Sequence, residues 1–349
     1  MGKTPMRPEQ WQSFKRAAKR ASDGSAPVAL IVDSPWIPGY LGIGHLDYYL
    51  DPEAWFQANL RIVREFSDII MFPSWWVEYG MAIEPSAYGS RIHFWPDQPP
   101  AQSPALRSIA DAGNLPAINP QTDGLMPFAL HRYRTQRNRI LDAGYIIPAV
   151  AARGPLCTAA FLRGVSEFMM DIVDSPEAVH KLLAHTTDTA IAWLKAQAEA
   201  AGDTVEGILV LDDIVGFLSG RAYKEFAHPY LKRICDAFPP DWVKVYHNDA
   251  NVRPFLADLP DTGFDVLNWS HKLDVAEARA KTGGRLCLMG NVPPLDMGVR
   301  GSADAVRDCA RAILEKTQGA GLILSVGGGV SPGMPKENML ALSEALALA

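Results

Sequence analysis

Short apolar runs alternate with longer stretches of helical spacing over most of the chain. Runs such as Val28–Val32 and Gly207–Leu211 are continuous and are not interrupted by polar residues. Continuous runs are typical of parallel strands that are buried on both faces. We predict strands at residues 28–32, 69–72, 145–150, 207–211, 243–246, 265–268, 285–289 and 322–325. This α/β alternation, with short connections in the second half, favours a closed (β/α)8 (TIM) barrel over an open doubly wound sheet.

Helices are expected between these strands. Two of them have a capping residue and an early proline, at Asp51-Pro52 and at Asp174-Ser175-Pro176, which favours a helix start. A helix therefore begins near Asp51. The others are expected at about residues 127–142, 174–201, 220–232, from 252 onward, 274–282, 303–317 and 336–347.

Two segments lie outside the strand–helix repeat. Residues 7–22 have helical apolar spacing, so we divide the chain into an N-terminal helical lead-in at 1–24 and one barrel domain at 25–349. Residues 89–95 alternate like a hairpin strand, and residues 96–124 are rich in Pro, Ala, Gly, Asn and Asp. Long irregular excursions of this kind are often lids. We expect an insertion over the barrel mouth.

The stretch Val243–Ala250 is a strand that ends in ligand-capable side chains. His247 and Asp249 are two positions apart and point the same way, whereas Asn248 points to the other face. Binding groups collect at the carboxyl ends of strands in such folds. The pair could hold a metal ion, act as a metal-free acid/base pair, or be a hydrogen-bonded strand end without chemistry.

Other polar and aromatic residues follow the ends of predicted strands. Asp212 and Asp213 are adjacent and face opposite ways, and we favour Asp213 as the one that enters the mouth, where it would assist catalysis with His247 and Asp249. Tryptophans in the first half could stack on an aromatic ligand or pack in the core or lid. The candidate substrate-binding residues are Trp36, Trp75, Trp76, Glu78, Asp212, Asn248 and Asn291.

Composition excludes several classes of function. The formal net charge is −6 and the basic residues form no run, so nucleic acid is not an expected partner. The opening residues lack the apolar run of a signal peptide, and no stretch approaches the ~18 apolar residues of a membrane span, so we expect a cytoplasmic protein without a membrane partner. The four cysteines are widely spaced and are expected to be buried thiols, with Cys157 a candidate nucleophile.

Several motifs resemble the uroporphyrinogen decarboxylase (URO-D) superfamily. They are Gly154–Gly164, Asp174–Leu183, Leu211–Ile214 with Tyr223–Arg233, Gly263–Asn268, Met289–Asn291 and Pro335–Asn338. The resemblance covers about residues 25–349. It implies a (β/α)8 barrel with a funnel at the strand carboxyl ends.

The resemblance implies two chemistries. True uroporphyrinogen decarboxylases carry an N-terminal Arg-rich segment that grips the substrate carboxylates. The equivalent segment here, Ala29–Tyr40, has no arginine, and an octacarboxylate would meet Asp33 instead. Repulsion between these charges argues against that substrate.

The other branch resembles methyltransferases that use a corrinoid. In that branch a zinc site is expected, with His-x-Cys on the fifth strand and a Cys in a Gly-Cys-Gly turn after the eighth. His247 stands where the histidine does, but Asp249 and Gly328 replace the two cysteines. A metal would therefore be held by His247 and Asp249, completed by Asp212, Asp213, Glu78 or Glu84.

The sequence thus favours a methyltransferase-like enzyme. It would move a methyl group from a small methylated donor (a methoxy-aromatic, methylamine or thioether) to a corrinoid on a separate corrinoid-binding protein. Zinc is a candidate cofactor although both expected cysteine ligands are missing. The alternatives are a decarboxylase of uroporphyrinogen or another carboxylated substrate, and a non-catalytic barrel that binds a corrinoid or tetrapyrrole. An oligomer is compatible with each of these three functions.

Overall fold

The computed structural model describes residues 8–21 and 26–347. Its strands are β1 (Ala29–Ile31), β2 (Ile70–Phe72), β3 (Ile92–His93), β4 (Ala101–Gln102), β5 (Val150–Arg153), β6 (Gly207–Leu211), β7 (Val243–Asn248), β8 (Val266–Trp269), β9 (Cys287–Val292) and β10 (Leu322–Val326). Its α-helices are α1 (Pro8–Ala18), α2 (Ile37–Leu41), α3 (His45–Leu50), α4 (Pro52–Glu65), α5 (Ile83–Ala87), α6 (Met126–Asp142), α7 (Pro155–Arg163), α8 (Val165–Asp174), α9 (Pro176–Ala201), α10 (Gly220–Phe226), α11 (His228–Asp236), α12 (Val275–Lys281), α13 (Ala303–Thr317) and α14 (Lys336–Ala347). Short 3-10 or π-helical turns lie at Ile109–Asn114, Asp213–Phe217, Leu259–Thr262 and Pro294–Val299.

The strands follow the order of a (β/α)8 barrel. Six parallel strands form one sheet in the order β10-β9-β8-β7-β6-β5, and β1 pairs in parallel with β2. Isolated parallel bridges join Val28 to Leu324 and Ile31 to Gly329, which places β1 beside β10. Within residues 8–21 and 26–347, no ladder of hydrogen bonds joins β2 to β5, so the ring of strands is open at that seam.

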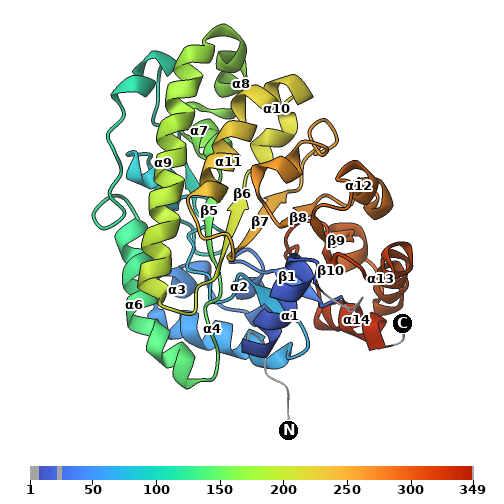
Figure 1. Cartoon of the computed structure of the whole chain (residues 1–349). Helices are drawn as coiled ribbons and strands as arrows, with labels where there is room; N and C mark the ends of the chain where they lie inside the picture. Colours follow the sequence, from blue (N-terminus) through green and yellow to red (C-terminus); the bar gives the residue numbers. More distant parts are fainter. Residues whose placement is uncertain (1–7, 22–25, 348–349) are drawn as a thin grey trace.

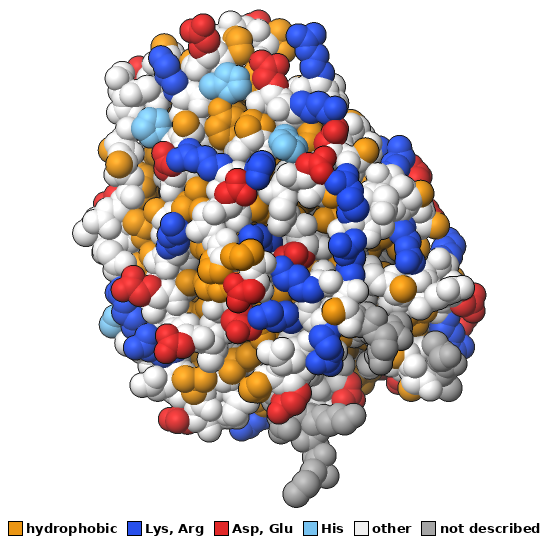
Figure 2. Space-filling view, in the orientation of Figure 1, with side chains coloured by type: hydrophobic (Ala, Val, Ile, Leu, Met, Phe, Trp, Pro, Cys, Tyr) orange, Lys and Arg blue, Asp and Glu red, His pale blue; other side chains and the backbone are white. Residues whose placement is uncertain are grey.

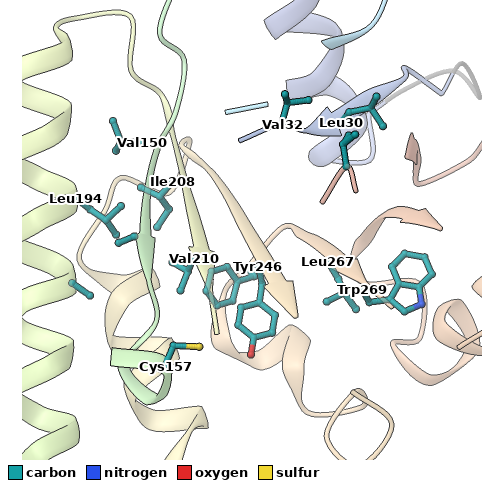
Figure 3. Close-up of a cluster of buried hydrophobic side chains, with 14 of the residues drawn as sticks. Leu30, Val32, Val150, Cys157, Leu194, Ile208, Val210, Tyr246, Leu267 and Trp269 are labelled. Atoms are coloured by element: carbon teal, nitrogen blue, oxygen red, sulfur yellow. The ribbon is translucent and has the colours of Figure 1, made fainter. Parts of the chain in front are cut away.

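Helices cover the outside of the strands. Figure 1 shows α6 and α9 along one side and α12, α13 and α14 on the other. Apolar side chains fill the space between the sheet and these helices; in Figure 3, Leu194 of α9 faces Val150 and Ile208 of the sheet. Burying such side chains stabilises the fold by about 1.5–3 kcal/mol each.

A separate apolar cluster fills the inside of the barrel, and α1 closes its amino-terminal end. Trp11 and Phe14 of α1 pack with Phe72 and with the inward side chains of β6 and β7. The Trp11 indole N–H donates to Glu206 at 2.8 Å, and Lys19 forms an ion pair with Asp265. Because this end is sealed, a ligand can enter the barrel only at the carboxyl ends of the strands.

The predicted helix at 7–22 is therefore present as α1. The predicted boundary at residue 24 falls in residues 22–25, outside the described ranges. The insertion over the mouth is also present: β3 and β4 pair in antiparallel register, and residues 96–124 are mostly irregular. The described part of the chain contains no helix long and apolar enough to cross a membrane.

Two predicted elements are wrong. The strand predicted at 145–150 begins only at Val150, because Pro148 lacks the N–H that a ladder needs. No α-helix lies between β7 and β8; residues 251–262 form turns and a short 3-10 helix, in a segment interrupted by Pro254 and Pro260. The segment between β5 and β6 contains α7 and α8 in addition to the predicted helix.

Candidate active site

A cavity of about 460 Å³ lies at the carboxyl ends of the strands. This volume is in the range of small-molecule sites. The ends of β1, β5, β6 and β7, the turn after β10 and the insertion at residues 99–102 contribute to its wall. The polar side chains that line it are Asp33, Glu78, Gln102, Arg153, Asp213, His247, Asp249 and Ser331.

His247 is held in one tautomer by its neighbours. The Asn268 amide donates from Nδ2 to the carbonyl of Met289 at 2.8 Å, which leaves Asn268 Oδ1 as the acceptor 2.7 Å from His247 Nδ1. Nδ1 therefore carries a proton and donates it to Asn268, which leaves Nε2 as the ring nitrogen available to a ligand. Nε2 is 3.6 Å from Asp213 Oδ1, and His247 is only 6% exposed.

Asp213 and Asp249 complete a group of three potential ligands. The Asp249 backbone N–H donates to Asp213 Oδ1 at 3.0 Å. One ligand-type atom from each of Asp213, His247 and Asp249 lies within 4.8 Å of the others. Desolvation at the cavity wall and the neighbouring Asp213 carboxylate raise the pKa of Asp249, while His247 opposes the shift. The structure thus brings together the three residues that the sequence suggested for catalysis.

A second polar group lines the opposite part of the cavity. Glu78 accepts backbone N–H groups from Ser34 at 2.5 Å and from Gly80 at 2.7 Å. Burial, and then the charge of Glu78, raise the pKa of Asp33 to about 8, although Arg153 lowers it. Arg153 was missed by the sequence analysis because the strand that carries it was placed too early.

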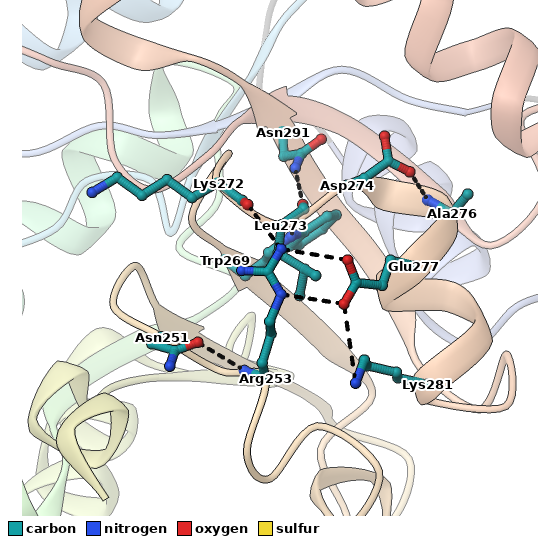
Figure 4. A network of polar contacts seen from close by, with 10 residues as sticks. All are labelled: Asn251, Arg253, Trp269, Lys272, Leu273, Asp274, Ala276, Glu277, Lys281 and Asn291. Carbon is teal, nitrogen blue, oxygen red and sulfur yellow. Dashed lines mark hydrogen bonds and ion pairs between the residues drawn. The ribbon is translucent and has the colours of Figure 1, made fainter.

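The remaining predicted polar residues lie outside the cavity and support its wall. Asp212 is fully buried and accepts the N–H groups of Leu156 and Cys157 at the start of α7. Asn248 donates to the Asp212 carbonyl at 2.8 Å. Asn291 donates to the carbonyl of Leu273 at 2.7 Å, as Figure 4 shows. These side chains fix strand ends and do not line the cavity.

The predicted tryptophans are also buried and do not line this cavity. Trp36 stacks on Tyr40 with ring centroids 4.4 Å apart and donates to the carbonyl of Met334. Trp75 packs against Phe56 and two other rings of the core. Trp76 is the nearest to the site, because the Arg153 guanidinium lies 5.9 Å from its ring centroid.

The loop that carries Asp249 is tied to its surroundings. Arg253 pairs with Glu277 of α12 at 3.2 Å and donates to the carbonyl of Lys272, a network drawn in Figure 4. On the other side, Gly328 touches the same loop: a Cβ atom at Gly328 would lie 3.3 Å from Asp249 Oδ2. The position where the resemblance implies a cysteine ligand is therefore beside the three-residue group.

The cysteines do not contribute to the site. Cys157 is buried, and burial raises the pKa of its thiol well above the usual value, which argues against the nucleophile considered above. Cys235 and Cys287 are also buried, whereas Cys309 is only partly so.

Figure 2 shows acidic and basic side chains interspersed on the face drawn there.

The barrel is sealed at its amino-terminal end, and a histidine and several carboxylates line a cavity at the open end. These features are typical of an α/β-barrel enzyme. The model of the family described as uroporphyrinogen decarboxylase (URO-D) matches residues 40–347, so the chain belongs to this family.

Curated relatives and a solved structure agree with this assignment. The chain is 29% identical over 254 residues to uroporphyrinogen decarboxylase of Chlorobium limicola (69% of this chain, 70% of the relative) and 25% identical over 348 residues to that of Chlorobaculum parvum (95% of each). A methyltransferase from Methanosarcina mazei has the same fold, with a TM-score of 0.83, 21% identity, and coverage of 97% of this chain and 98% of that chain. The curated relatives are thus named as decarboxylases, and the protein that shares the fold is named as a methyltransferase.

Proposed function

We propose that the protein moves a methyl group from a small methylated donor to a corrinoid carried by a separate protein. The observation that carries this proposal is the convergence of His247 Nε2 with the carboxylates of Asp213 and Asp249 in the barrel mouth. A methyltransferase of the same fold adds support.

The three side chains fit a divalent metal ion. His247 donates its other ring N–H to Asn268, which is the usual arrangement of a metal-bound histidine. Three protein ligands with an open position are typical of catalytic zinc sites. A bound ion would act as a Lewis acid on the donor heteroatom. Two carboxylates in place of two thiolates make a harder ligand set, which suits an oxygen or nitrogen donor.

The side chains also have roles of their own. Asn268 orients the imidazole so that Nε2 faces the cavity. When the methyl group leaves, the donor heteroatom gains an electron pair and needs a proton. Without a bound ion, Asp249, whose pKa is raised, is placed to supply that proton; with an ion bound, Asp249 would serve as a ligand instead. The apolar part of the wall includes Leu211, Met81 and Pro100.

The test is formation of methylcob(III)alamin from cob(I)alamin with methoxy-aromatic, methylamine and thioether donors. We expect turnover with at least one donor and its loss in His247→Ala. His131→Ala is the matched control, because His131 is exposed on α6. Absence of turnover with every donor, in a folded protein, would contradict the proposal.

Decarboxylation is the second candidate, because the curated relatives are named uroporphyrinogen decarboxylases. Against it, four carboxyl groups and one arginine line the cavity, which disfavours a substrate with many carboxylates. Release of CO2 from uroporphyrinogen without methyl transfer would replace our proposal with this one. Corrinoid binding with neither reaction would indicate the non-catalytic carrier.

A further inference from the structure

Arg153 is a buried cation in the wall of the proposed active site, and we propose that it anchors a carboxylate of the methyl donor. The donor would then be a small methylated carboxylic acid. This inference rests on the proposed function, since it names the substrate class of the same site.

The backbone holds Arg153 at the cavity. It is the last residue of β5, and its N–H donates to Glu84 Oε1 at 2.7 Å. The side chain is 8% exposed and lines the cavity. Its position is therefore set by the sheet and not by a loop.

The Arg153 guanidinium has few partners. Within residues 8–21 and 26–347, its one hydrogen bond is a long one, from Nη2 to the carbonyl of Gly80 at 3.3 Å. Among the described residues, no carboxylate oxygen lies within 4.0 Å of it, since Glu78 and Glu84 accept backbone N–H groups instead. A guanidinium carries five N–H donors, so most of its donors make no hydrogen bond to the described residues, although Asp33, Glu78 and Glu84 lie near enough to feel its charge.

A second buried arginine shows what a structural role requires. Arg132 of α6 is 6% exposed, similar to Arg153. Its guanidinium donates to three successive backbone carbonyls, those of Tyr48, Tyr49 and Leu50. Arg132 is thus satisfied by the protein, whereas Arg153 keeps most of its donors for a ligand in the cavity.

The position of Arg153 relative to His247 fits a small acid. Arg153 pairs with Leu211, and Leu211 pairs with His247, so the three residues form one row across β5, β6 and β7. Side chains in one row share a face of the sheet, and two strand spacings separate Arg153 from His247 by about 10 Å at Cα. One small carbon skeleton could therefore place its carboxylate at Arg153 and its methylated heteroatom at His247.

The test compares three ligands of one shape by calorimetry on the full chain without corrinoid: 3-methoxybenzoate, 3-methoxybenzyl alcohol and 3-methoxybenzylamine. We expect the benzoate to bind about 10- to 100-fold tighter than the alcohol, as expected for a charge-assisted hydrogen bond. Arg153→Gln should reduce benzoate binding to the level of the alcohol without changing binding of the alcohol. Arg153→Lys should restore part of the difference. Arg134→Gln, at an exposed arginine of α6, should change neither.

Equal or tighter binding of the alcohol or amine by the wild type would overturn the inference, and so would an unchanged preference in Arg153→Gln. Retained alcohol binding shows that the variant is folded. Because the measurement needs no methyl transfer, a preference for the acid without any turnover would contradict the proposed function alone. Turnover of donors without a preference for the acid would contradict the anchor alone.

Discussion

The two sides of the cavity differ in what their polar groups can do. On the side of β6 and β7, Asp213, His247 and Asp249 direct ligand atoms at one point. On the side of β1, β2 and β5, Asp33, Glu78 and Arg153 are spread along the wall, and Glu78 and Arg153 form hydrogen bonds with backbone groups. The first arrangement suits chemistry on one atom, and the second suits recognition of the rest of a molecule.

The difference also lies in how each side is supported. Asn268 and the loop network of Arg253 hold the β6–β7 side through hydrogen bonds that fix both position and tautomer. The other side lies next to the open seam between β2 and β5 and is covered by the insertion. Substitutions on the first side should therefore change kcat, and those on the second side should change KM.

The largest expected effect is loss of a bound metal. Asp213→Asn and Asp249→Asn each remove one anionic ligand atom, so metal affinity should fall more than about 100-fold, since even loss of an outer partner costs about 10–100-fold. Metal content by mass spectrometry, together with turnover, measures this. Asp241→Asn, at an exposed aspartate, is the control. Stoichiometric metal in both site variants would show that the carboxylates are not ligands.

A smaller effect is expected at Arg153. With a carboxylate donor, Arg153→Gln should raise KM about 10- to 100-fold and leave kcat nearly unchanged, because the anchor binds ground state and transition state alike. Steady-state kinetics at saturating corrinoid protein measure both constants. If instead kcat falls and KM stays constant, Arg153 takes part in the chemical step, as we propose for the residues of the β6–β7 side. The distinction between the two sides of the cavity would then be wrong.

A substitution at Gly328 tests how tightly the residues on the β6–β7 side of the cavity are packed. A methyl group at Gly328→Ala would press on the Asp249 carboxylate, and we expect turnover to fall about tenfold, because small displacements at a site reduce rate strongly. Gly144→Ala is the matched control: its φ is also positive, at +88° against +108° at Gly328, but a Cβ there has nothing within 4 Å. Both variants should lose similar stability in thermal unfolding. Equal loss of turnover in both would indicate general backbone strain.

The smallest expected effect is a pH-dependent change in the stability of the protein that comes from Asp33, on the side of β1, β2 and β5. The folded pKa of Asp33 is about 8 against 3.8 for the free side chain, owing to burial and Glu78, with Arg153 opposing. The folded state thus holds the proton more tightly, and stability falls as pH rises from about 4 to 8. Asp33→Asn removes this ionisation, so its Tm should exceed that of the wild type by about 2–4 °C at pH 8.5 and by less at pH 5. A Tm difference independent of pH would contradict the shift.

The sequence predicted the strands of the second half of the fold well and those of the first half less well. Strands such as β6 and β10 are continuous apolar runs between helical segments, so their pattern is unambiguous. The run at Tyr145–Val150 has the same composition, but Pro148 and the preceding helix delay pairing until Val150. This shift hid Arg153, because the sequence analysis ended the strand before it.

The site could be predicted where the alternation of side chains along a strand determines which residues face the cavity. His247 lines the cavity and Asn248, the next residue of β7, does not, as alternation requires; Asp213 begins a 3-10 helix after β6, so its place in the cavity depends on that turn. Burial of an aromatic side chain does not follow such a rule, so Trp36 and Trp75 could not be assigned to core or cavity from sequence. The pKa of Asp33 depends on the approach of Glu78 from a distant segment, and this too requires the three-dimensional structure.

The central claim is that the atom acted on at His247 is a methylated heteroatom, and isotopic labelling tests it most directly. The measurement follows 3-methoxybenzoate, labelled at the methyl carbon, in the presence of the protein and cob(I)alamin by NMR. Our account predicts that the label appears on cobalt in step with release of 3-hydroxybenzoate. If the label stays in its ether while the carboxyl group leaves as CO2, or if no label moves at all, the account is wrong.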